Sequence, residues 1–285
     1  PPKRMLPLGP FRIPLGKPLI RAGRRSQPFW KTLGDNGIFS TVLRVPITFP
    51  AEKFNGVLLS AMSVPDLHGS QGTYFYFSSD TTGETQLSDS MQSGERIAFS
   101  IENDIARAAI PGPDNPVRAD GNPLELPLEL QKGRNGSDAT LCVDGTTYDL
   151  KRRCYTPWIE LGFHAAPGVT VRGIVRFYLL ELEPHFKLYM TPINIDPDKP
   201  ALPISHPFTY AVYLSKTQGR YATLGLAEDT SALNEGVVDE DAFLDLTYQI
   251  HNEREQMFFD ALDKTSRGAV VCVFDITDRL QHMFF

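Results

Sequence analysis

Cysteine and long apolar runs are both scarce in this sequence, and each shortage excludes a class of protein. The chain has 285 residues and three cysteines, Cys142, Cys154 and Cys272, with no CxxC motif. This count excludes a disulfide framework and a zinc knuckle. We expect free thiols. A Cys142–Cys154 disulfide is the alternative if the strands that carry these residues are adjacent. No apolar run reaches the ~20 residues that a membrane-spanning helix needs, so no transmembrane segment is expected.

Positive charge and the common catalytic signatures are also missing. The formal net charge is -6, which argues against a footprint on duplex nucleic acid. The first 25 residues are an exception, being basic without any acid, and they suit a solvated arm or an anion-attracting segment. No GxSxG, P-loop or GxGxxG motif occurs. No signal peptide is recognisable, and the compartment stays open, with the cytoplasm as a working expectation.

The patterned part of the chain begins as a helix that feeds strands. Residues 26–37, SQPFWKTLGDNG, predict a short helix with Ser26 as N-cap, Pro28 in its first turn and Gly34 or Gly37 as its stop. Residues 38–50 and 56–65 then predict two strands, the second of them buried. A helix followed by strands is typical of an α/β sheet.

The pattern changes between about residues 69 and 205. Strand-like pieces such as TYFYFSS, ATLCVDG and VTVRGIVRFYLLELE alternate with turn signals such as GPDNP and GRNGSD. No long amphipathic helix is recognisable here, so a β-sandwich or a curled barrel is expected. The proline-rich segment NIDPDKPALPISHP would link this region to the helical residues after it.

Helical periodicity returns after Pro207. Residues 208–219 predict a short helix ended by Gly219, and residues 239–268 a long one capped by Asp239 or Asp241. The run AVVCVF then predicts a parallel strand covered on both faces. The expected organisation is therefore an extended lead over 1–25, an α/β core in two pieces, 26–66 and 205–285, and an inserted all-β domain over 67–204.

The strongest candidate site lies just after that last strand. Asp275 closes the strand, and Asp278 and His282 stand four residues apart, on one face of any helix that forms there. A carboxylate and an imidazole so placed suit two ligands of one divalent ion such as zinc. The alternative is an Asp that caps the helix and a His that is solvated.

The other histidines favour structural or surface roles. His251 is expected on a solvated helix face beside Glu253 and Glu255, and Asp66 with His68 suits turn chemistry after a strand. The remaining histidines are scattered along the chain: His164, His185 and His206.

The segment GAVVCVFDITDRLQHMFF, residues 268–285, resembles the type I phosphodiesterase/nucleotide pyrophosphatase branch of the alkaline phosphatase superfamily. Further stretches similar to that branch are PFWKTLGDNGIFSTVLRVPITFP, MSVPDLHGSQGTYFYFSS, LYMTPINIDPDKPALPISHP and GLAEDTSALNEGVVDEDAFL. Asp278 and His282 match its D-x3-H ligand pair, and Asp275 matches the acidic position before it. The resemblance implies an alkaline-phosphatase-like core and two divalent ions, zinc or manganese, in the intact protein.

The same resemblance implies a phosphate-ester substrate and a metal-activated Thr or Ser nucleophile that forms a covalent phospho-enzyme. No stretch here matches that nucleophile, the first metal-binding Asp or the last ligands. The chain is therefore expected to be the central portion of a longer enzyme, to be inactive by itself, and to bind no metal or one ion weakly. Its oligomeric state stays open.

A second hypothesis is a binding or interaction module carried by the β-rich insert, or a non-catalytic scaffold of the same family. Tyr155, Trp158 and Phe163 are its candidate groove residues, with core packing as the alternative.

Overall fold

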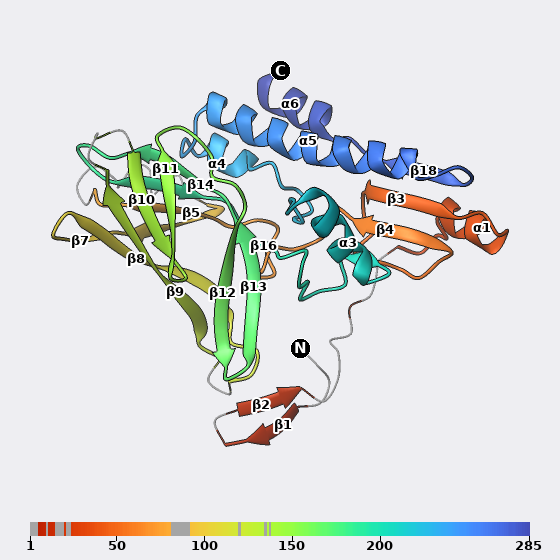
Figure 1. Cartoon of the computed structure of the whole chain (residues 1–285), viewed down its shortest axis with the longest axis horizontal. Helices are drawn as coiled ribbons and strands as arrows, with labels where there is room; N and C mark the ends of the chain where they lie inside the picture. The colour runs from red at the N-terminus through yellow and green to blue at the C-terminus, as the bar shows by residue number, and fades with distance from the viewer. Residues whose placement is uncertain are drawn as a thin grey trace. The chain divides into compact units, whose positions relative to one another are not determined.

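The computed structural model describes residues 5–9, 11–14, 20, 24–80, 92–118, 121–133, 136 and 138–285. Over these residues the fold is mixed α/β, made mostly of strands in several sheets, with five helices (Figure 1). This confirms the coarse α/β expectation. The chain divides into two compact units. The strand-rich unit comprises 1–19, 67–193 and 229–243, and the parallel-sheet unit comprises 20–66, 194–228 and 244–285.

The strand-rich unit contains β1 (Met5–Leu8), β2 (Phe11–Pro14), β5 (Tyr74–Ser78), β6 (Gly94–Ala98), β7 (Ser100–Glu102), β8 (Ile105–Asp114), β9 (Pro123–Lys132), β10 (Asp138–Val143), β11 (Thr146–Lys151), β12 (Ile159–Ala166), β13 (Val169–Val175), β14 (Phe177–Glu181), β15 (Lys187–Met190) and α4 (Thr230–Asn234). The parallel-sheet unit contains α1 (Phe29–Asp35), β3 (Ser40–Val45), β4 (Gly56–Ser60), β16 (Asn194–Ile195), β17 (Ser205–His206), α3 (Thr209–Gln218), β18 (Ala269–Cys272) and α6 (Ile276–Phe284). Helix α5 (Glu240–Asp263) begins in the first unit and continues in the second.

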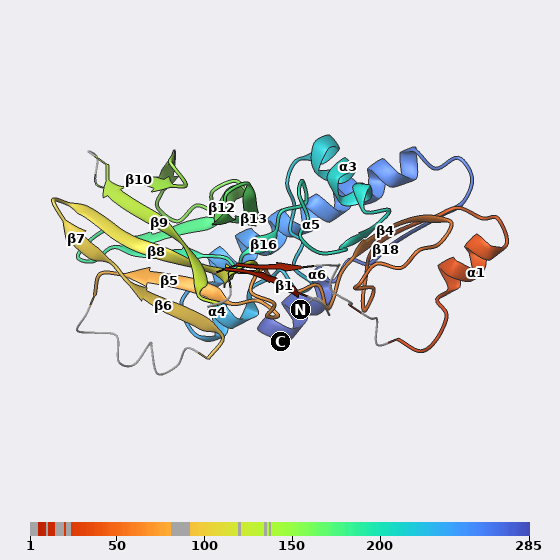
Figure 2. The same ribbon diagram turned by 90° about the horizontal axis from the view of Figure 1, so that it is seen from below.

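Two sheets dominate the strand-rich unit, in the orders β11-β10-β9-β8-β7 and β14-β15-β5-β6. Figure 2 shows β8 and β9 layered over β5 and β6. Strict alternation places Leu124, Leu126, Leu128 and Leu130 of β9 in one core. Asp144 and Gly145, with φ of 50° and 70°, form the two-residue turn between β10 and β11, as their Asp-Gly sequence favours.

Residues 5–8 and 11–14 form strands, which differs there from the extended lead expected from the Pro and Gly content of residues 1–25. Strands β1 and β2 pair as an antiparallel hairpin that groups with the strand-rich unit. The amide of Arg12 in β2 donates a 2.7 Å hydrogen bond to the carbonyl of Val117. These strands are too short to show a clear period 2 in the sequence. The boundary near residue 204 also differs, because the division falls after Ile193.

The parallel-sheet unit is built on the order β17-β4-β3-β18, in which β4, β3 and β18 are parallel. Trp30 of α1 packs on Val42 and Leu58 of this sheet. The parallel pairing of β18 agrees with its apolar sequence, but the full burial that cover on both faces would give is not observed. Among the described strands β18 pairs with β3 alone, and each of its four residues is half-buried.

Some helix boundaries agree with the capping residues that the sequence predicts, and two differ from the prediction. Helix α1 has Pro28 at its N-cap and no side-chain cap bond, so the assignment of Ser26 is wrong. Gly37, with φ of 76°, follows the C-cap of α1 as the expected stop. Asp239 caps α5, its Oδ1 accepting a 3.0 Å hydrogen bond from the amide of Ala242. Helix α5 ends at Asp263, sooner than the expected 268.

Candidate functional site

The carboxyl ends of β3, β4 and β18 meet at one edge of the parallel-sheet unit. The register pairs Leu43 of β3 with Leu59 of β4 on one side and with Cys272 of β18 on the other. In open α/β sheets functional groups gather beyond such an edge. The residues at and beyond the ends of these three strands therefore make up the candidate site.

Arg44, one residue before the end of β3, occupies the left-handed region with φ of 56° at an irregularity between Leu43 and Val45. Its buried guanidinium donates from Nη1 to the carbonyl of Ser60 at 3.2 Å and from Nη2 to that of Leu224 at 2.8 Å. Burial lowers the pKa of Arg44 to about 9, which leaves the group charged at neutral pH. Arg44 thus ties the end of β4 to the 224–225 loop.

Backbone conformations that most residues avoid cluster at this edge. Ile47, beyond β3, has φ of 56°, and Ser63, beyond β4, has φ of 84°. A β-branched residue at positive φ is a genuine outlier, and strain of this kind concentrates at functional sites. Gly225 packs closely against residues 61–64, which follow β4. A Cβ at this position would lie 2.8 Å from the backbone nitrogen of Ser63.

An ionic triad, Glu228–Arg254–Asp275, lies beside β18, with Glu228 and Arg254 buried and Asp275 half-buried. Nη2 of Arg254 is 2.9 Å from Oε1 of Glu228, with side chains only 3% and 1% exposed. Nη1 of Arg254 forms an ion pair with Oδ1 of Asp275, whose side chain is 23% exposed. Burial raises the pKa of Cys272 to about 11, although Arg254 and Arg44 act to lower it. Cys272 is therefore a neutral thiol here, unsuited to act as a nucleophile.

Asp275 stands at the N-cap position of α6, but its side chain makes no cap hydrogen bond. The helix-capping role that was the alternative for an Asp at this position is therefore not observed for Asp275. The carboxylate of Asp275 forms its ion pair with Arg254 instead, and is not one of the two candidate metal ligands on α6.

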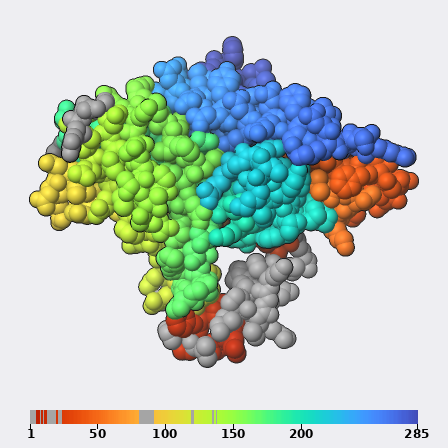
Figure 3. Space-filling model, viewed as in Figure 1, coloured from red at the N-terminus to blue at the C-terminus, as the bar shows by residue number. Residues whose placement is uncertain are grey.

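Asp278 and His282 lie on one face of α6, the helix after β18. Oδ1 of Asp278 is 3.4 Å from Nε2 of His282, and the side chains are 60% and 74% exposed. Figure 3 shows the dark blue C-terminal residues at the surface. Two ligands at ~2.0–2.1 Å from a tetrahedral zinc ion stand about 3.3 Å apart, so this pair fits two corners of such a site.

The described residues contain no group of three or more His, Cys, Asp or Glu side chains that could hold a metal ion. Within the described residues, Asp278 and His282 are therefore two candidate ligands, and their assignment to a metal ion stays a prediction. The three cysteines are free, so the Cys142–Cys154 bond considered above is not formed.

Sequence reasoning misplaced one histidine. His251 is half-buried rather than solvated, and its ring packs edge-on against Phe274 with centroids 5.6 Å apart. The ring of His68 lies 5.6 Å from that of Phe75, and Asp66 is buried. The period of α5 gave no signal for His251, because the neighbouring strand end that covers it comes from residues much later in the chain.

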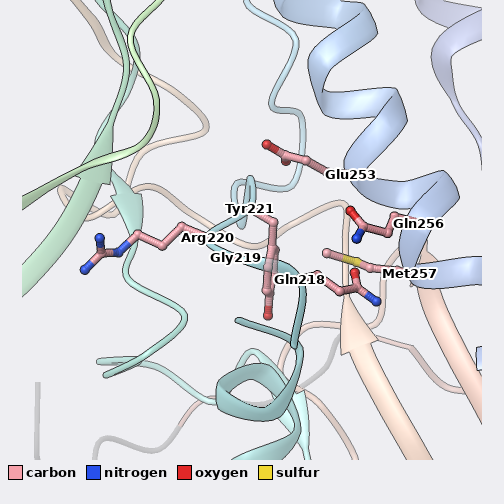
Figure 4. Close-up of a pocket in the computed structure, with 7 residues that line it drawn as sticks. All are labelled: Gln218, Gly219, Arg220, Tyr221, Glu253, Gln256 and Met257. Carbon is pink, nitrogen blue, oxygen red and sulfur yellow. The ribbon is translucent and has the colours of Figure 1, made fainter. Parts of the chain in front are cut away.

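The sequence also did not predict a small pocket that lies between the C-terminal end of α3 and helix α5 (Figure 4). Its lining is Gln218, Gly219, Arg220, Tyr221, Glu253, Gln256 and Met257. Glu253, expected on a solvated face, accepts a 2.9 Å hydrogen bond from the amide of Ala222 through Oε2. Figure 4 shows Gln218, Gln256 and Met257 pointing toward one another and Arg220 pointing away.

The candidate groove residues of the β-rich region belong mostly to packed structure. Phe163 is fully buried in the main core. Tyr155 packs on Tyr178 with ring centroids 4.6 Å apart, and the guanidinium of Arg176 lies 4.7 Å from the ring centroid of Trp158. The core-packing alternative therefore holds for Phe163.

Comparisons of the chain with protein families, with characterised proteins and with solved structures give no match. Within the described part of the chain, every helix is too short or too polar to cross a membrane.

Proposed function

We propose that this chain supplies two ligands, Asp278 and His282, to a divalent ion of a metal-dependent phosphodiesterase or phosphatase. The observation that carries the proposal is the 3.4 Å separation of Oδ1 and Nε2 on α6, just beyond a parallel strand. An alkaline-phosphatase-like core interrupted by a β-rich domain is the fold that this proposal expects. The open carboxyl edge of β4, β3 and β18 supports it.

The donor set suits the proposed ion. A carboxylate oxygen and an imidazole nitrogen are ligands that zinc and manganese accept. Both side chains are exposed, so an ion and a substrate could reach them without unfolding α6. A bound ion would polarise a phosphoryl oxygen of a phosphate ester. The proposal assigns the other ligands, a second ion and the Ser or Thr nucleophile to polypeptide outside this chain.

Zinc titration of the chain, monitored by the imidazole signals of its histidines, tests the proposal. Zinc should shift the signal of His282 first, and both His282→Ala and Asp278→Asn should abolish that response. His164, exposed on β12 and hydrogen-bonded to Thr170, provides the matched control, because His164→Ala should leave zinc binding unchanged. Equal zinc affinity in wild type and His282→Ala would refute the proposal.

A further inference from the structure

The triad Glu228–Arg254–Asp275 joins three segments of the parallel-sheet unit, namely the end of the 219–228 loop, the middle of α5 and the start of α6. From this geometry we infer that Arg254 is a positioning residue. Through Asp275 it sets the first turn of α6, and with it the direction in which Asp278 and His282 point. The inference rests on the proposed function for what α6 does, but the positioning itself is a property of this chain.

Burial makes the triad specific in its geometry. Arg254 is 3% exposed and is held from one side by Glu228, which is 1% exposed. A buried guanidinium needs opposite charge beside it, because an unpaired buried charge is strongly unfavourable. Its second arm is directed to Asp275. The position of the Asp275 carboxylate is therefore dictated from α5.

The charges around the triad make Asp275 an important partner of Arg254, because Glu228 also interacts with a second cation. Arg44 is a second buried cation beside this triad, and its charge interacts unfavourably with Arg254 and favourably with Glu228. Glu228 thus faces both cations. The other titratable groups beside Arg44, the thiol of Cys272 and the buried hydroxyl of Tyr221, are both neutral because burial raises their pKa values. Removing the charge of Asp275 leaves Arg254 with one acid shared between two cations.

The backbone transmits this constraint to the ligand pair. The carbonyl of Asp275 accepts a 3.0 Å hydrogen bond from the amide of Arg279, which closes the first turn of α6. Its side chain stands at the N-cap position yet caps nothing in that turn. Asp278 lies inside the turn and His282 one turn further, so a rotation of the first turn moves both donor atoms.

Hydrogen exchange and zinc titration together test the inference in the full chain. Asp275→Asn removes the charge with little change of shape, Arg254→Lys keeps the charge but loses the fork, and Arg267→Met changes an exposed arginine as control. In Asp275→Asn we expect α6 amides to exchange at least about tenfold faster while β3 and β4 amides keep their rates. We expect zinc affinity at His282 to fall about tenfold or more, as for other residues that orient metal ligands. Arg254→Lys should show smaller shifts in both readouts, and Arg267→Met none.

The two measurements, hydrogen exchange and zinc titration, distinguish failure of the inference from failure of the proposed function. If the wild-type chain binds no zinc at His282, the proposed function fails, and the exchange rates of α6 alone decide on Arg254. Unchanged α6 exchange in Asp275→Asn and Arg254→Lys overturns the inference. Equal acceleration in α6, β3 and β4, with unchanged zinc affinity of the folded chain, also overturns it, because that pattern is general destabilisation.

Discussion

The hydroxyl of Tyr189 donates a 2.6 Å hydrogen bond to Oδ2 of Asp229 inside the strand-rich unit. A second tyrosine, Tyr74, donates to Oε2 of Glu235 at 2.5 Å. Asp229 and Glu235 are the N-cap and C-cap residues of α4. Tyrosines from β15 and β5 therefore hold both ends of this short helix, and the two acids anchor segment 229–243 to the strand-rich unit.

The burial of Asp229 predicts a pH dependence of stability. Burial raises the pKa of Asp229 to about 6 from 3.8, against smaller lowering effects of its hydrogen bonds. Because the folded state then holds this proton more tightly than the unfolded chain, stability falls as pH rises through about 6. Between about pH 7.5 and about pH 5 we expect Asp229 to add ~1.4 kcal/mol to the free energy of unfolding.

Urea unfolding at several pH values in a Trp30→Phe background checks this prediction. Trp158 is then the remaining tryptophan and reports the strand-rich unit. In Asp229→Asn, which keeps one acceptor oxygen and cannot titrate, the acid-side gain should disappear. A stability curve for Asp229→Asn parallel to that of wild type would contradict the assignment.

Arg254→Met should be among the most destabilising single changes in the parallel-sheet unit. It removes the ion-pair partner of the buried Glu228, and breaking a buried pair in this way costs about 3 to 5 kcal/mol. Arg267→Met, at an exposed position, should change stability by about 0.5 kcal/mol or less. Unfolding monitored by Trp30 fluorescence in a Trp158→Phe background measures both, and similar midpoints for the two variants would rule out a stabilising triad.

Phe163→Ala distinguishes core from groove in the strand-rich unit. The ring is fully buried, so its removal should cost about 3 to 5 kcal/mol. Val169→Ala, on the partner strand of the same hairpin and 40% exposed, is the control and should cost under about 1 kcal/mol. A near-neutral Phe163→Ala would make Phe163 a groove candidate again.

Turnover of a chromogenic phosphodiester should not exceed the background rate of the metal salt, with zinc or manganese present. The described residues bring two ligands together, and a two-metal clamp on a phosphoryl group needs more. The His282→Ala variant should give the same background. Turnover well above that background, lost in His282→Ala, would show that this chain is itself the enzyme.

Local chemistry made several elements predictable. Gly219, with φ of 87°, ends α3 as expected, because a positive φ suits glycine. Asp239 caps α5. The Asp144–Gly145 turn follows from its own sequence. Errors arose where distant residues decide, as for β18, whose apolar run suits a central strand although the structure leaves it half-buried beside β3.

The ligand pair was predictable because its geometry is local. Residues four apart share a face of any helix, so Asp278 and His282 meet wherever that helix lies. The partner of Asp275 was not predictable, since Glu228, Arg254 and Asp275 are brought together only by packing. Polar residues on a helix are usually exposed, and nothing in the period of α5 marks Arg254 as buried.

The sequence by itself determined several local features of this protein, namely turns such as Asp144–Gly145, some helix ends, the strand-rich character of residues 69–205 and the one-face placement of Asp278 and His282. These depend on backbone preferences and spacings within a few residues. Only the tertiary structure decided that Arg254 pairs with two acids, that Arg44 ties β4 to the 224–225 loop, and that Tyr189 holds Asp229. Burial and charge pairing between distant segments depend on how the whole chain packs, and no short-range pattern records them.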